Sequence, residues 1–236
     1  MKMLAIETAT ARTAVAVGDD TGVTEEVPAG RGRHTEVLAP SVTALLAARG
    51  WSPQDLDGVV VDVGPGLFTG LRVGIATAKG LAVATGVGLF AVTSTDVLAQ
   101  TACDAGITGR VAAVVDARRR EVFWALYDVD PASFTTLVAV AVAPPSMLSS
   151  RLDELDGPVT LVGDGALAHR AALGGGAARL VRDDVQVPSA ASAIRLARSR
   201  IETGAVASSH HEVHPWYLRE ADAVANFQVR GPSVAP

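Results

Sequence analysis

The fold is decided by one stretch near the start of the chain, LAIETATARTAVAVGDDTGVTEEV, residues 4–27. Three runs in it have the composition of β-strands: Leu4–Glu7, Thr13–Gly18 and Val23–Val27. The last two are separated by residues 19–22, Asp-Asp-Thr-Gly, which are a strong turn signal. The stretch therefore predicts three consecutive antiparallel strands. A doubly wound Rossmann fold is disfavoured, because it would alternate strands and helices from its first element.

The rest of the first half predicts helices that alternate with strands. Leu38, Val42 and Leu45 fall on one face of the first of these helices, as expected for a helix packed on a sheet. Ser94 is expected to cap the last helix. The predicted elements are a helix, a strand, a helix, a strand and a helix, at about Thr35–Arg49, Val59–Val63, Gly70–Thr85, Leu89–Val92 and Ser94–Ala105.

The second half repeats this order, so the chain is predicted to be a duplication. Each half places three antiparallel strands beside parallel strands joined by right-handed crossovers. The predicted fold class is α/β, a duplicated ribonuclease-H-like fold of the actin, Hsp70 and sugar-kinase type (the ASKHA fold). We expect an N-terminal lobe at residues 1–106, a C-terminal lobe at 107–219 and a flexible tail at 220–236. The predicted elements of the second half are Val111–Asp116, Val122–Asp128, Leu137–Val142, Pro145–Leu155, Val159–Val162, Gly165–Leu173, Leu180–Val181 and Ala190–Thr203.

Composition narrows the classes of partner and location. The chain has 236 residues and a formal net charge of −5, so we expect no long-range attraction to the phosphate backbone of a nucleic acid. Its one basic cluster, Arg118-Arg119-Arg120, is typical of a solvated turn. The single cysteine, Cys103, excludes an internal disulfide, and no apolar run reaches the roughly 18 residues of a membrane span. With no signal-peptide core at its start, the chain is predicted to be cytoplasmic.

The densest motif is a glycine-rich stretch, GPGLFTGLRVGIATAKG, residues 64–80. Its position between a predicted strand and a predicted helix is open to three interpretations. Its amides could cradle a phosphate, although it lacks both the Gly-Lys-Ser/Thr of a Walker motif and the Rossmann fingerprint. Its glycines could instead allow close packing of the helix on the sheet. The third interpretation concerns the helix, which is apolar nearly all round and must therefore bury more than one face. One face can lie on its own sheet, and the other needs a second helix, which could belong to a partner.

At this stretch the chain resembles the TsaB family, also called YeaZ. TsaB proteins are the non-catalytic paralogues of TsaD in the bacterial pathway that makes threonylcarbamoyladenosine next to the tRNA anticodon. The resemblance implies a scaffold subunit, not an enzyme, that binds TsaD and, with it, the ATPase TsaE. The matching segments appear in the family's order along nearly the whole chain: Leu4–Thr10, His34–Pro40, Val63–Arg72, Ala76–Leu81, Asp116–Val122 and Pro215–Arg219.

The resemblance also implies where the partners bind. TsaB proteins pair with TsaD through their N-terminal lobes, and we expect the first two helices to build an intermolecular helix bundle. The same apolar face is expected to form a homodimer when TsaD is absent. The expected interface residues are Leu38, Val42, Leu45, Gly70, Leu71, Gly74, Ile75 and Ala78.

No catalytic or metal-binding residue is expected in this chain. TsaD binds its metal through two histidines spaced four residues apart just after the fifth strand, and Ser94 and Leu98 stand at those positions here. His210 and His214 have a metal-like spacing but lack the helical His-Glu-x-x-His order, so we interpret them as surface residues.

A reduced nucleotide site is the remaining expectation. In this fold, phosphates are held by two hairpin turns, each an acidic residue followed by a glycine. The turns here, Glu-Thr-Ala-Thr at 7–10 and Asp-Ala-Arg-Arg at 116–119, contain no glycine. We expect a vestigial site without tight ATP binding. Binding of ATP or ADP with magnesium at the interface of the complex is left open. The residues of this site are Glu7, Thr8, Thr10 and Asp116.

Direct binding of tRNA by this chain is one alternative function, and the net charge of −5 disfavours it. Two further alternatives come from other classes. One is a free-standing ATPase or small-molecule kinase of the same fold, which needs glycine in the phosphate turns and a catalytic aspartate between the lobes. The other is a peptidase acting on TsaD, which needs a constellation of nucleophile and base to which nothing in the sequence points.

Overall fold

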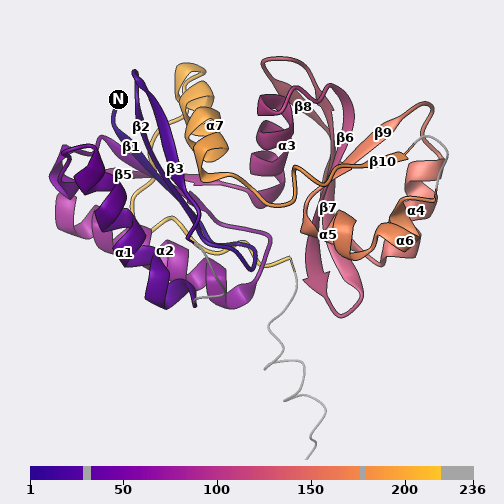
Figure 1. Cartoon of the computed structure of the whole chain (residues 1–236), viewed down its shortest axis with the longest axis horizontal. Helices are drawn as coiled ribbons and strands as arrows, with labels where there is room; N and C mark the ends of the chain where they lie inside the picture. The colour runs from indigo at the N-terminus through magenta and orange to yellow at the C-terminus, as the bar shows by residue number, and fades with distance from the viewer. Residues whose placement is uncertain (29–32, 176–178, 219–236) are drawn as a thin grey trace, which may run out of the picture.

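The computed structural model describes residues 1–28, 33–175 and 179–218, so the predicted tail at 220–236 lies outside the described residues. Two five-stranded sheets stand side by side, with two helices between them and further helices on their outer faces (Figure 1). Apolar clusters fill both faces of each sheet. The molecule is thus a layered α/β structure.

The first sheet consists of β1 (Met3–Glu7), β2 (Ala14–Asp19), β3 (Gly22–Glu26), β4 (Gly58–Asp62) and β5 (Gly88–Val92). Its strand order is β3-β2-β1-β4-β5. The first three strands pair antiparallel, as the opening stretch predicts, and β4 and β5 add in parallel beside β1. β1 and β4 are buried along their whole length, because helices cover both faces of the sheet at its centre.

The second sheet consists of β6 (Gly109–Arg118), β7 (Glu121–Val129), β8 (Phe134–Ala143), β9 (Val159–Val162) and β10 (Arg179–Val181). Its order, β10-β9-β6-β7-β8, is that of the first sheet with β6 in the place of β1. β6, β7 and β8 pair antiparallel, and β9 and β10 extend the sheet in parallel from β6. The predicted duplicated ribonuclease-H-like fold is therefore confirmed.

The outer helices cover the sheets of their own halves. α1 (His34–Ala48) and α2 (Phe68–Thr85) lie on the first sheet, with the 3-10 turn η1 (Pro53–Asp55) beside them. α4 (Pro145–Asp153), α5 (Asp164–Ala168) and α6 (Arg170–Leu173) lie on the second. No helix in the described part of the chain is long and apolar enough to cross a membrane.

The two helices between the sheets are exchanged between the halves of the chain (Figure 1). α3 (Ser94–Asp104), which follows β5, packs on β6 and β7 of the second sheet. α7 (Ala190–Glu202), near the end of the chain, packs on β1 and β2 of the first sheet. The division into lobes at residue 106 stays a prediction, and the exchange means that each sheet is covered by a helix from beyond that boundary.

Two local predictions are wrong. The N-cap of α3 is Thr93, whose Oγ1 accepts a hydrogen bond from Asp96 N at 3.2 Å, whereas Ser94 is fully buried. The single helix predicted at 165–173 is two short helices, α5 and α6, which meet at His169.

Candidate functional site

The turn after β1 is the first half of the expected nucleotide site, and its groups are bonded within the chain. Glu7 is 1% exposed, and its Oε1 accepts a hydrogen bond from Ala9 N at 2.7 Å. Thr8 is fully buried and donates its hydroxyl to the Gly70 carbonyl at 2.8 Å. Thr10 is buried as well. This turn is therefore a junction inside the core.

The glycine-rich loop after β4 packs directly on the same turn. Leu67 N donates to the Ala9 carbonyl at 2.7 Å. A side chain at Gly66 would overlap the Ala9 carbonyl, and a side chain at Gly70 would overlap the Thr8 carbonyl. Of the three interpretations of the motif, close packing is the one that these contacts show. The loop covers the turn.

Asp62, at the carboxyl end of β4, is a neighbour of Glu7 that sequence reasoning missed. β1 and β4 are adjacent parallel strands in register, so their last residues lie side by side. Asp62 Oδ1 accepts hydrogen bonds from Gly64 N at 2.7 Å and from the Ser94 hydroxyl at 2.8 Å. The other two oxygens, Glu7 Oε2 and Asp62 Oδ2, are buried and have no hydrogen-bond partner among the described residues. The two carboxyl groups are close enough to interact with each other.

Burial raises the pKa of both carboxyl groups. For Glu7 the charge of Asp62 adds to the effect of burial, and the pKa lies well above its ordinary value. For Asp62 burial raises the pKa, although hydrogen bonds with Glu7, Gly64 and Ser94 oppose the shift. Two buried carboxylates cannot both ionise cheaply without a cation, so this pair retains a proton above the pH at which isolated carboxyl groups lose theirs.

Asp116, the second half of the expected nucleotide site, has different surroundings. Its side chain is 14% exposed and accepts hydrogen bonds from the backbone N and from Nη1 of Arg118, both at 2.9 Å. His169 Nε2 lies 3.9 Å from its Oδ1. The backbone N of Asp116 donates to Asp164 Oδ1 at 3.0 Å. This carboxylate is thus held at the surface by the backbone and the guanidinium group of Arg118, with the His169 ring nearby.

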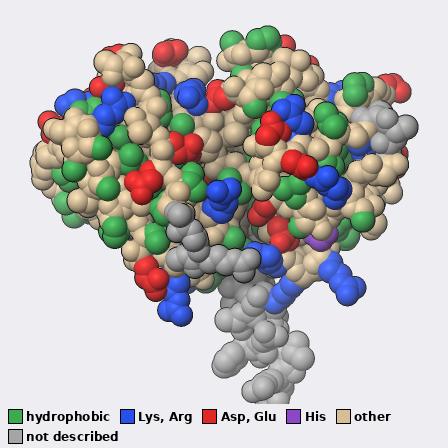
Figure 2. All heavy atoms as spheres, viewed as in Figure 1, with side chains coloured by type: hydrophobic (Ala, Val, Ile, Leu, Met, Phe, Trp, Pro, Cys, Tyr) green, Lys and Arg blue, Asp and Glu red, His purple; other side chains and the backbone are tan. Residues whose placement is uncertain are grey.

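The turn that follows Asp116 is shaped by three arginines. Arg118, Arg119 and Arg120 have φ angles of 61°, 54° and 63°, the left-handed region that disfavours side chains. All three are exposed, and basic side chains project below β6 and β7 at the lower edge of the molecule (Figure 2). The predicted solvated turn agrees with this exposure.

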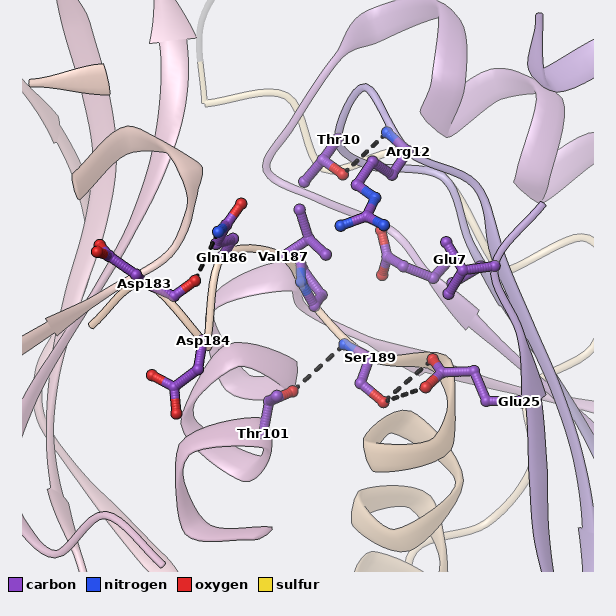
Figure 3. Close-up of a pocket in the computed structure, with 13 residues that line it drawn as sticks. Glu7, Thr10, Arg12, Glu25, Thr101, Asp183, Asp184, Gln186, Val187 and Ser189 are labelled. Carbon is purple, nitrogen blue, oxygen red and sulfur yellow. Dashed lines mark hydrogen bonds between the residues drawn. The ribbon is translucent and has the colours of Figure 1, made fainter. Parts of the chain in front are cut away.

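A pocket of about 250 Å³ lies between the first sheet and residues 183–189 (Figure 3). Glu7 and Thr10 line it, whereas Thr8 and Asp116 are not among its lining residues. Four acidic residues and one arginine carry its charge, so the lining disfavours a polyphosphate. These residues are Glu7, Glu25, Asp183, Asp184 and Arg12.

The N-terminus of α7 at this pocket is capped by groups of the chain. Glu25 Oε1 accepts a hydrogen bond from Ala190 N at 2.6 Å, and both its oxygens accept from the Ser189 hydroxyl at 3.1 Å (Figure 3). A helix N-terminus is otherwise a favourable place for a phosphate. Glu25 therefore occupies the position that an anionic ligand would need.

The residues expected at the partner interface lie inside the first lobe. All eight are buried, and a side chain at Gly74 would overlap the Thr8 hydroxyl in the turn after β1. The expectation that they form an exposed face is corrected by this burial, because α1 and α2 lay that face on β1 and β4. The eight are Leu38, Val42, Leu45, Gly70, Leu71, Gly74, Ile75 and Ala78.

Away from the sheet, α1 and α2 border an apolar groove of about 280 Å³. Val42 is the one expected interface residue that lines it. Along α1, a row of small exposed residues at four-residue spacing lines the groove: Ala39, Thr43 and Ala47. This spacing is visible in the sequence and could have indicated the groove, but sequence reasoning missed it. The complete lining is Ala39, Val42, Thr43, Leu46, Ala47, Trp51, Pro53, Thr77 and Leu81.

Comparison with known proteins shows the family of the chain. The sequence profile of the family TsaD, described as tRNA N6-adenosine threonylcarbamoyltransferase, matches residues 22–211. The Escherichia coli protein named tRNA threonylcarbamoyladenosine biosynthesis protein TsaB is 33% identical over 221 residues, which cover 93% of this chain and 95% of that protein. This chain belongs to the TsaB family.

Other TsaB relatives extend the match. The TsaB protein of Bacillus subtilis is 29% identical over 171 residues, which cover 72% of this chain and 74% of that protein. A crystal structure described as an uncharacterized Pseudomonas aeruginosa protein with similarity to peptidase YEAZ has a TM-score of 0.82 and 28% identity, over 92% of this chain and 99% of that one. The whole two-lobed fold is therefore shared with a YeaZ-like structure.

In this TsaB chain, the positions of the TsaD histidines belong to the core. Ser94 donates its hydroxyl to Asp62, and Leu98 lies in the apolar cluster between α3 and the second sheet. Among the described residues, no group of three or more histidines, cysteines and acids is arranged to hold a metal ion. The rings of His210 and His211 lie against each other at a tilt of 41°, with centroids 4.0 Å apart.

Proposed function

We propose that this chain is a non-catalytic scaffold subunit, in the cytoplasm, of the machinery that makes threonylcarbamoyladenosine in tRNA. It is required for threonylcarbamoyl transfer to the adenosine next to the anticodon, and it acts by binding the catalytic subunit TsaD and, with it, TsaE. The observation that carries the proposal is the open apolar groove between α1 and α2, in a chain whose relatives are named for this pathway.

The groove suits a helical partner. Its floor is apolar, and the small side chains of Ala39, Thr43 and Ala47 let another helix approach α1 closely. Monomeric proteins rarely leave such a surface uncovered. We propose that helices of TsaD complete a bundle here, and that a second copy of this chain takes their place when TsaD is absent.

The proposed lack of catalysis by this chain is supported by the surroundings of its first phosphate-type turn, residues 7–10. The first turn is covered by the glycine-rich loop, and the pocket beside it is acidic. Independent binding of ATP, as a kinase or ATPase of this fold would require, is therefore disfavoured. A nucleotide with magnesium at the interface of the complex stays a proposal, with Asp116 as the more accessible of the two acidic turn residues.

A peptidase activity has little support in the described residues. Cys103 donates its thiol to the Asp130 carbonyl at 3.2 Å, and burial raises the pKa of the thiol. An activated nucleophile needs the opposite shift.

The test is a co-purification of the chain with TsaD. Ala47→Arg places a charge in the groove at an exposed helical position, so the chain should fold while its affinity for TsaD falls at least about tenfold. Ala84→Arg is the matched control, since Ala84 is exposed on α2 and does not line the groove. Equal binding by the two variants, measured by calorimetric titration with TsaD, would place the interface elsewhere. Gly74→Arg is unsuitable, because the side chain would collide with the Thr8 hydroxyl just beyond β1.

A further inference from the structure

We infer that Glu7 and Asp62 share one proton between Oε2 and Oδ2, and that this proton clamps together the loops around the first turn. The inference concerns the isolated chain and goes beyond the proposed scaffold role. It rests on the position of the two groups: both are 1% exposed, they end adjacent parallel strands, and each has one buried oxygen without a hydrogen-bond partner among the described residues.

The surroundings of the pair do not neutralise a second charge. The groups that face Glu7 from β3 and Asp62 from α3 are themselves acidic, Glu25 and Asp96, and each raises the pKa of its neighbour. Asp96 is committed to an ion pair with Arg200 at 2.6 Å. Arg12 lines the neighbouring pocket, yet forms no ion pair with Glu7 among the described contacts. A proton is the smallest cation that satisfies both oxygens.

The oxygens on the outer side of the pair hold three separate segments. Glu7 Oε1 binds Ala9 N in the first turn, and Asp62 Oδ1 binds Gly64 N and the Ser94 hydroxyl. Gly64 opens the loop that leads into α2, and Ser94 is the first residue of α3. Loss of the shared proton would place two like charges at this junction, so the three segments should separate together.

The expected pH dependence has a definite sign. In the unfolded chain both carboxyl groups ionise near pH 4, whereas the folded chain retains one proton up to the raised pKa of the pair. Between these two points the folded state binds one proton more than the unfolded state. The folding equilibrium constant therefore falls about tenfold for each unit that the pH rises, and levels off only above the folded pKa.

The experiment is chemical denaturation of the full chain between pH 5.5 and 9, with Glu7→Gln and Asp62→Asn as probes. In Glu7→Gln the amide can still accept from Ala9 N and can donate to Asp62, so it replaces the shared proton without a titratable group. Asp62→Asn does the same from the other side. Each variant should lose the tenfold fall per pH unit and exceed the wild-type stability at the alkaline end. Glu202→Gln, at an exposed acid on α7, should keep the wild-type slope.

Infrared spectroscopy supplies a second measurement, one whose signal would not change if the two residues had only a structural role. The wild-type chain at pH 7 should show the carbonyl band of a protonated carboxyl group in a dry site, and both probe variants should lack it. An unchanged pH slope in both variants, or absence of this band from the wild type, would overturn the inference. Magnesium or manganese chloride that stabilises the wild type alone at pH 8.5 would also overturn it, since a metal ion and not a proton would then bridge the pair.

Discussion

The two lobes have the same strand order and place an acid pair at the same point, yet the two pairs have opposite surroundings. In the first lobe, Glu7 and Asp62 end β1 and β4 in a sealed core. In the second, Asp116 lies near the end of β6 and Asp164 just after β9, with Arg118 and His169 beside Asp116. We infer that the first pair shares a proton, whereas the second is partly exposed and its Asp116 is paired with the guanidinium group of Arg118.

This difference shows what the duplication preserved. Backbone pairing and the glycine-lined approach of a helix to the first strand occur in both lobes, because they are set by the strand order. Gly70 of α2 approaches Thr8, and Gly165 of α5 approaches Val115 in the same way. The chemistry of the turns was free to diverge. The first became a packed junction and the second an exposed basic tip.

The largest expected effect comes from the helix glycine of the first lobe. Gly70→Ala would press its methyl group into the Thr8 carbonyl of a buried strand end, and the 18-residue helix α2 cannot shift alone. We expect a loss of about 3 kcal/mol or more in the free energy of unfolding. Gly80→Ala on the same helix meets no atom within 4 Å and should stabilise the chain by about 0.5–1 kcal/mol.

Gly165→Ala carries this comparison into the second lobe. A methyl group there would lie 2.8 Å from the Val115 carbonyl carbon, a milder conflict, and α5 has only five residues and can adjust. Its loss of stability in urea denaturation should be smaller than that of Gly70→Ala. If Gly165→Ala proved the more damaging, the first turn would not be the more rigid junction.

A smaller effect is expected from Asp164, the buried member of the second pair. Burial raises the pKa of Asp164, and the charge of Asp116 adds to this, while Arg118 opposes it. A folded pKa above the unfolded value means that stability falls as pH rises through this range. Asp164→Asn should therefore flatten the curve of stability against pH, though by less than Glu7→Gln. A curve unchanged by Asp164→Asn, measured by thermal denaturation from pH 4 to pH 8, would contradict this assignment.

Much of the fold was predictable because its signals are local. The turn at Asp19–Gly22 and the apolar runs beside it gave the strand meander, and its repetition gave the duplication. The exchange of α3 and α7 was not predictable in this way. Both helices follow a parallel strand, and which sheet they cover depends on contacts between distant parts of the chain.

The site was predicted less well, for two different reasons. α2 is apolar nearly all round, so its periodicity could not distinguish the face on the sheet from the face toward a partner. Five buried residues of α2, together with three of α1, were therefore assigned to a surface. The Glu7–Asp62 pair, by contrast, was within reach. Two acids at the carboxyl ends of adjacent parallel strands must meet at one sheet edge, and only the significance of Asp62 was overlooked.

The smallest expected effect is on stability, from a substitution that tests what the side chain of Arg120 contributes to the second turn. Arg120 has a φ of 63°, a conformation that glycine adopts without the steric cost carried by a side chain. Arg120→Gly should therefore leave the chain as stable as before or raise its free energy of unfolding by up to about 1 kcal/mol, as measured in urea.

Asp116→Asn is the companion variant, because it weakens the bonds that hold Arg118 and should loosen the same tip. A clear loss of stability in Arg120→Gly would show that the guanidinium group holds the hairpin together. A neutral or positive change would mean that the Arg120 side chain is not needed to hold this turn, in contrast to the residues of the first turn, which serve the core.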